Sequence, residues 1–81
     1  MSVDITADQL RAARAMVNWT REQLADKSGT TTRTLARLEA GETKARSTTA
    51  TAIRAALEAA GVIFIPSNGD GPGVKLRKGS E

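Results

Sequence analysis

The 81-residue sequence predicts a mainly α-helical fold of four helices, followed by a C-terminal β-hairpin or strand pair. From residue 7 to residue 60, alanine and leucine recur at intervals of three and four, as in amphipathic helices that approach one another closely. Residues 61–81 contain five of the seven glycines and both prolines, around two short runs typical of strands. We therefore expect a helical domain over residues 1–61 and a strand segment over residues 62–81.

The first helix is predicted from Ala7 to about Val17. Thr6 is followed three residues later by Gln9, which is the spacing of a capping box at a helix start. Leu10 and Ala13 lie on the same helical face as Val17. This face is expected to enter the core.

The second helix is predicted to begin at Arg21, because Thr20 and Gln23 repeat the capping-box spacing. It is expected to end at Gly29, since glycine readily adopts the left-handed conformation of a C-terminal cap. Trp19, which precedes this helix, is expected in the core where the first two helices meet.

The third helix is predicted to begin after Thr31 as N-cap and to reach Ala40, with Gly41 as its stop. Leu35 and Leu38 form its apolar face. Two short helices joined by a three- or four-residue turn that contains glycine form a helix-turn-helix arrangement. The sequence therefore predicts this motif, with the turn and its second helix over about residues 29–40.

The fourth helix is predicted from about Thr49 to Ala60, with Ser47 or Thr48 as its N-cap and Gly61 as its end. Its apolar stripe consists of Ala50, Ile53, Ala56, Leu57 and Ala60.

Two strands are predicted around a glycine-rich loop, over Val62–Ile65 and Val74–Arg77. A lone two-stranded hairpin is marginally stable in water, so it must pack on the helices or pair with a second copy of the chain. We expect it to serve as a dimerisation element and to be followed by a disordered basic end. The apolar side chains expected on one face of the strands, and hence in the dimer interface, are Val62, Phe64, Val74 and Leu76.

The composition excludes several classes of function. The chain has no cysteine and no histidine, so disulfides, thiol catalysis, zinc fingers and the usual general base are excluded, and any metal would need carboxylates alone. We therefore expect no enzyme, no cofactor, no metal site and no small-molecule substrate. The net charge of +3 suits a polyanionic partner. The longest apolar run, Val62–Ile65, is too short to span a bilayer, and the first residues do not resemble a signal segment, so a cytoplasmic protein is expected.

Residues 24–46, LADKSGTTTRTLARLEAGETKAR, resemble the Xre family of phage-repressor and Cro-like helix-turn-helix proteins. The spacing from Leu24 and Ala25 through Gly29 to Leu35, and then to residues 38–41, is the central pattern of that family. The ending AGVIFIPSNGDGPGVKLRK, residues 60–78, is similar to small single-domain members in which strands replace a fifth helix.

The resemblance implies that the third helix lies in the DNA major groove, where Thr32, Arg33 and Arg37 reach base edges. It also implies an ion pair between Arg14 and Glu39 that joins the first helix to the end of the third. The implied phosphate contacts are Thr20, Arg21, Thr31, Lys44 and Arg46.

The sequence thus predicts a sequence-specific DNA-binding transcriptional regulator, a repressor or autoregulator, that acts as a homodimer on double-stranded DNA. From periodicity alone, Arg33 and Arg37 are also consistent with a solvated helix face, and Lys44 and Arg46 with ordinary loop charges. The alternative function is an antitoxin-like or antiactivator helix-turn-helix module whose main partner is another protein.

Overall fold

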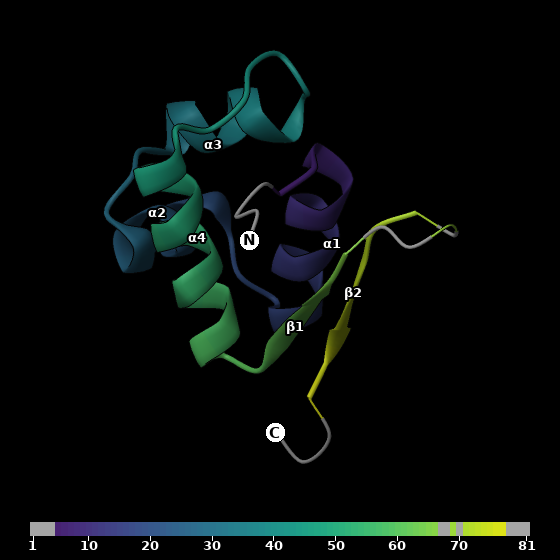
Figure 1. Ribbon diagram of the computed structural model, residues 1–81. Helices are drawn as coiled ribbons and strands as arrows, with labels where there is room; N and C mark the ends of the chain where they lie inside the picture. Colours follow the sequence, from purple (N-terminus) through teal and green to yellow (C-terminus); the bar gives the residue numbers. More distant parts are fainter. Residues whose placement is uncertain (1–4, 67–68, 70, 78–81) are drawn as a thin grey trace.

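The computed structural model describes residues 5–66, 69 and 71–77. Within these residues the chain forms four helices followed by an antiparallel pair of strands, which confirms the predicted fold class (Figure 1). The elements are α1 (Ala7–Val17), α2 (Arg21–Ser28), α3 (Thr32–Glu39), α4 (Ser47–Ala59), β1 (Val62–Ile65) and β2 (Gly73–Leu76). The predicted disordered basic end, residues 78–81, lies outside the described part of the chain.

The first two helices begin with the predicted capping boxes. The Gln9 backbone N–H donates to the Thr6 hydroxyl at 3.0 Å, and the Thr6 N–H donates to the Gln9 side-chain oxygen at 3.0 Å. Thr20 and Gln23 repeat this exchange at 3.1 and 2.8 Å. Gly29 closes α2 in the left-handed conformation, with φ of +77°. The two predicted capping boxes are thus confirmed. They can be predicted from spacing because each joins residues only three apart in the chain.

The start of α4 differs from its prediction. The helix begins at Ser47, two residues before the expected start at Thr49, and Arg46 occupies the N-cap position without a side-chain capping bond. Ser47 and Thr48 therefore lie inside the first turn instead of capping it. Both residues are exposed, so water can satisfy the free N–H groups of that turn and no side-chain cap is required.

The core draws on all four helices and on β1. Its buried members are Leu10, Ala13, Leu24, Ala25, Leu35, Leu38, Ile53, Leu57, Val62 and Phe64. Trp19 is half-buried and packs against this cluster, with the Lys27 ammonium 5.0 Å from the centre of its ring. The predicted apolar faces of α1, α3 and α4 thus meet in one cluster.

The strands pair in an antiparallel register, with Val62 opposite Leu76 and Ile65 opposite Gly73. The second strand spans Gly73–Leu76 and not Val74–Arg77, because Gly73 completes the ladder at the loop end. Beyond the strand, the Arg77 N–H donates to the Gly61 carbonyl at 2.6 Å. β1 packs against α4 and α1, while β2 packs against α1 (Figure 1).

The four residues predicted for dimerisation have unequal exposure. Val62 and Phe64 are 2% and 7% exposed and fill the protein's own core, and Val74 is half-buried. Leu76 is 47% exposed. A second copy could therefore contact Leu76 and the open edge of β2, whereas helices of the same chain already cover Val62 and Phe64. The dimer itself stays a prediction.

One polar side chain, Gln9, ties the hairpin to α1. It is 6% exposed, and its side-chain nitrogen donates to the Ile65 carbonyl at 3.3 Å and to the Gly73 carbonyl at 3.0 Å. Its oxygen accepts the capping-box hydrogen bond from Thr6. Gln9 therefore caps a helix and also holds the loop end of both strands.

Candidate nucleic-acid interface

Helix α3 has one buried face and one exposed face. Leu35 and Leu38 are 0% and 7% exposed, and they pack into the core. Thr32, Arg33 and Arg37 all lie on the exposed side of the helix. The alternation follows from the helical period, since residues three and four apart share a face. The exposed side of α3 consequently carries one short polar side chain and two basic ones.

A shallow hollow of about 490 Å³ lies between the start of α2 and the first turns of α3. The residues that line it are Arg14, Thr20, Arg21, Glu22, Thr32, Arg33 and Ala36. It brings together two predicted phosphate contacts and two predicted base contacts that are separated by more than ten residues in the sequence. Guanidinium groups beside a helix N-terminus are suited to binding the oxygens of a phosphate backbone.

Arg37 lies further along α3, beside a carboxylate that the sequence analysis did not single out. Its Nε is 3.7 Å from Oε1 of Glu42, and the Glu42 backbone N–H donates to the Arg37 carbonyl at 3.0 Å. Both side chains are more than half exposed, so this pair contributes little to stability. Arg37 can therefore exchange this contact for another acceptor.

The remaining predicted phosphate contacts lie outside the hollow. The Thr31 hydroxyl caps α3 by accepting from the Thr34 N–H at 3.1 Å, and Arg46 is exposed at the start of α4. Lys44 lines a different cavity, next to the start of α1. The structure thus groups Thr20, Arg21, Thr32 and Arg33, while Thr31, Lys44 and Arg46 lie elsewhere on the surface.

Glu39, the last residue of α3, is the centre of a buried ionic cluster. Its side chain is 1% exposed, and its carboxylate accepts from Arg14 Nε at 2.7 Å and Arg14 Nη2 at 3.0 Å. Arg21 Nε donates to the same carboxylate at 3.1 Å. Arg14 also donates to the Trp19 carbonyl at 2.9 Å, and Arg11 donates to the Glu39 carbonyl. The structure therefore brings the predicted partners Arg14 and Glu39 together in a bidentate pair.

The ionic cluster shifts the acidity of both partners. Burial by itself would raise the pKa of Glu39, but hydrogen bonds from Arg14 and Arg21 and their positive charges lower that pKa below its ordinary value. The hydrogen bond to Glu39 raises the pKa of Arg14, against a smaller opposing effect of burial. Both groups are accordingly charged at neutral pH, and the end of α3 is attached to α1 and α2.

Three contributions to this arrangement were missed at the level of the sequence. Arg21 was assigned to phosphate alone, although its Nε is bound to Glu39. Arg11 and Gln9 were not singled out as contacts between elements. The placement of Arg11 and Arg14 three residues apart on α1 was the available signal, since it puts two guanidinium groups along one side of the helix.

The comparison with known families agrees with this geometry. A family model of helix-turn-helix proteins, of the Cro type and Xre-like, matches residues 10–60. The chain belongs to this family. The match covers most of α1 and all of α2, α3 and α4, and it leaves the strand pair outside. No curated protein matches the chain in sequence.

Membership confirms the predicted resemblance and assigns the chain to DNA-binding helix-turn-helix regulators, a family that is not enzymatic. The exposed side of α3 and the hollow beside it are therefore the candidate DNA interface. Within the described residues, no helix is both long and apolar enough to cross a membrane.

Proposed function

We propose that the protein is a sequence-specific transcriptional regulator, a repressor or autoregulator, that binds double-stranded DNA as a homodimer with α3 in the major groove. The observation that carries the proposal is the exposed row of Thr32, Arg33 and Arg37 on a helix whose opposite side is held in place. An α-helix with its side chains is about 10–12 Å across, which fits a major groove about 12 Å wide.

Base reading is assigned to the two arginines and the threonine of α3. A guanidinium can donate two parallel hydrogen bonds to guanine O6 and N7, and a threonine can contact a thymine methyl group. Thr20 and Arg21 at the start of α2 would hold the phosphate backbone, with Thr31, Lys44 and Arg46 as further phosphate contacts. In this arrangement the phosphates fix the position of α3, and α3 reads the sequence.

The dimer is assigned to the hairpin, with β2 as the contact edge. β2 pairs with β1 alone within the described chain, and Leu76 beside its open edge is 47% exposed. A second copy related by a two-fold axis would cover that edge, and the dimer would span two half-sites if its two recognition helices lie about 34 Å apart, one turn of DNA. Residues 43–49, in and after the α3–α4 loop, are the alternative contact.

Selection of bound sites from random duplex DNA tests the proposal directly. We expect an enriched, two-fold symmetric site. On that site, Arg37→Ala should weaken binding by about 1–3 kcal/mol and affect random DNA much less, because it removes base contacts. Lys44→Ala should weaken both DNAs alike, whereas Lys27→Ala removes the same charge from the exposed end of α2, outside both proposed interfaces, and serves as the control. Equal losses on specific and random DNA for Arg37→Ala would overturn the assignment of base reading.

Sedimentation of the full chain tests the dimer. Deleting the hairpin would remove Val62 and Phe64 from the core, so a surface change is the sharper probe. Leu76→Glu should leave the protomer folded and lower the sedimenting mass toward that of one chain, since two buried carboxylates would oppose association. An unchanged dimer in this variant would place the interface elsewhere.

A second candidate function is an antitoxin-like or antiactivator module whose main partner is another protein. The exposure of Ile63 and Leu76 on the hairpin, 36% and 47%, favours it as an alternative. Failure to enrich any DNA site, together with a stable complex on the hairpin, would favour this function over the first.

A further inference from the structure

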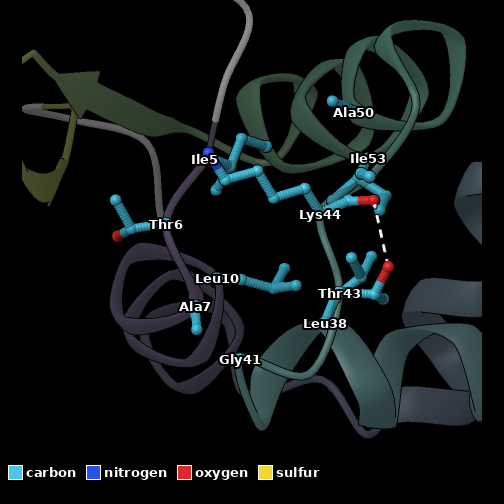
Figure 2. A pocket seen from close by; sticks show the side chains of 11 residues that line it. Ile5, Thr6, Ala7, Leu10, Leu38, Gly41, Thr43, Lys44, Ala50 and Ile53 are labelled. Atoms are coloured by element: carbon cyan, nitrogen blue, oxygen red, sulfur yellow. Dashed lines mark hydrogen bonds between the residues drawn. The ribbon is translucent and has the colours of Figure 1, made fainter.

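A second cavity, distinct from the hollow beside α3, lies between the start of α1, the α3–α4 loop and α4 (Figure 2). Its volume is about 380 Å³, which lies within the range of small-molecule sites. Side chains from three helices reach it: Leu10 from α1, Leu38 from α3 and Ile53 from α4. Each of the three is at most 7% exposed, so the core itself forms the wall of the cavity.

Few polar side chains line this cavity, and the charge in its described lining is positive. Thr6 is engaged in the capping box of α1, and the Thr43 hydroxyl donates to the Lys44 carbonyl at 3.5 Å. Lys44 is the one charged residue in the described lining, which contains no acidic side chain. Figure 2 shows the Lys44 side chain extended from the α3–α4 loop along the cavity toward Ile5. An apolar wall thus lies beside a single ammonium group.

We propose that this cavity binds a small aliphatic carboxylate, with its hydrocarbon chain against the apolar wall and its carboxylate paired with Lys44. The charge selects the head group, because an anion gains a charge-assisted hydrogen bond from the ammonium while a cation is repelled. The volume selects the length, since about 380 Å³ at roughly 30 Å³ for each water-sized group holds about a dozen non-hydrogen atoms. Carboxylates of about six to ten carbons meet both conditions.

Occupancy of the cavity would also regulate DNA binding, and this half of the inference rests on the proposed function. Lys44 is a predicted phosphate contact, so a carboxylate that holds its ammonium removes one positive charge from the DNA interface. The ligand then acts by competition for one side chain and requires no change of fold. Bound DNA should in turn weaken binding of the carboxylate, because the coupling free energy between two ligands acts equally on both.

The test uses the full chain at pH 7 and follows amide chemical shifts during titration with octanoate, octanol and octylammonium. We expect octanoate to bind saturably at one site with a dissociation constant of about 0.1–1 mM, as suits ten non-hydrogen atoms. Octylammonium should bind at least tenfold more weakly. Lys44→Met, which keeps the apolar stem, should weaken octanoate about fivefold to tenfold and leave octanol unchanged, whereas the control Lys75→Met should alter neither.

Ala50→Leu provides a second variant, because Ala50 lines the cavity from α4 and a larger side chain there fills it. It should abolish octanoate binding. The ligand comparison on the unaltered chain keeps the test decisive even if this variant folds poorly. Absence of saturable binding, or equal affinity for octanoate and octylammonium, would overturn the proposed site.

Two further outcomes would assign the cavity to another occupant and overturn the proposal. Octanoate that binds only after residues 1–4 are removed would mean that the chain's own N-terminal residues occupy the site. A sedimenting mass that falls with Ala50→Leu would mean that a second copy occupies it. Octanoate that binds as expected while affinity for random duplex DNA stays constant would overturn the regulatory half alone, and failure of the chain to bind any DNA would count against the proposed function and not against the site.

Discussion

Helix α3 and the β-hairpin are both attached to α1, but by opposite kinds of chemistry. Glu39 at the end of α3 is a buried charge held by guanidinium groups of α1 and α2. The hairpin is attached through the apolar side chains of Val62 and Phe64, with one neutral amide, Gln9, bonded to its backbone. Apolar packing holds both elements, through Leu35 and Leu38 in α3 and through Val62 and Phe64 in β1, and only α3 adds a buried ion pair.

The buried ion pair and the apolar packing contribute differently to stability and to orientation. A buried ion pair gains little net stability, because desolvation offsets most of its attraction, but it is strongly directional. Such bonds constrain the orientation of α3, whose exposed side is the proposed DNA-reading surface. Apolar packing depends on buried area and not on direction, so it suits a hairpin that mainly covers the helices.

Removal of the buried charge should have the largest effect on stability. We expect Glu39→Ala to lower the free energy of unfolding by about 3 kcal/mol, at the low end for a broken buried pair because Arg14 and Arg21 still reach solvent. Urea denaturation measures the loss. Glu58→Ala is the matched control, since Glu58 pairs with Arg54 at 2.9 Å on the surface, and it should cost less than about 1 kcal/mol.

A double substitution separates the value of the pair from the cost of breaking it. Arg14→Met with Glu39→Leu should recover much of the stability lost in Glu39→Ala, because neither charge remains buried without its partner. DNA affinity in the double variant should nevertheless be lower than in the unaltered chain, since the side-chain bonds from Glu39 to α1 and α2 are lost. Full DNA affinity in that variant would show that apolar packing alone orients α3. The ion pair would then not distinguish the attachment of α3 from that of the hairpin.

Substitution of the Gln9 amide should have the next largest effect on the free energy of unfolding. Gln9→Glu keeps the acceptor that the capping box needs but replaces the nitrogen that donates to the Ile65 and Gly73 carbonyls. We expect a loss of about 2 kcal/mol at pH 7, because the buried site then holds a carboxylate against two carbonyl oxygens. Gln23→Glu makes the same change in the exposed capping box of α2, and its unfolding free energy should change by at most about 0.5 kcal/mol.

Hydrogen exchange distinguishes the two regions in the Gln9 variant. Protection should fall first at the strand amides, while the amides of α3 keep theirs, because the hydrogen bonds of the Gln9 side chain reach the hairpin and the start of α1. Uniform loss of protection over both regions would mean that the hairpin and α3 are not independently attached.

The smallest expected effect is the dependence of stability on pH. The pKa of Glu39 in the folded protein lies below its ordinary value of 4.5, so the unfolded chain binds its proton first as pH falls. The stability that this carboxylate provides is complete above pH 4.5 and is lost as pH falls through its folded pKa. Urea midpoints between pH 7 and pH 3 should therefore fall less steeply for Glu39→Gln than for the unaltered chain, with Glu58→Gln as control. Parallel curves for Glu39→Gln and the unaltered chain would show that Glu39 titrates alike in both states.

The elements of the fold could be predicted where the deciding contacts are local. The Thr6–Gln9 and Thr20–Gln23 exchanges and the glycine at the end of α2 involve residues within a few positions of each other, so spacing alone located these boundaries. The start of α4 was misplaced because exposed Ser47 and Thr48 have the composition of caps, whereas water can serve the same N–H groups. Alternation predicted Val62 and Leu76 on one face of the strands, but it predicted neither their pairing nor the difference in their burial.

The sequence by itself determined four helices, a strand pair and a basic exposed side on α3, because capping, helical period and alternation are properties of neighbouring residues. Only the tertiary structure decided that Arg21 shares Glu39 with Arg14, that Gln9 holds the hairpin, and that Lys44 lies beside an apolar cavity. Those contacts join residues 18 to 64 positions apart, or depend on how three helices pack around a space. No local pattern specifies them, since side chains with several possible partners are assigned only when the elements have packed.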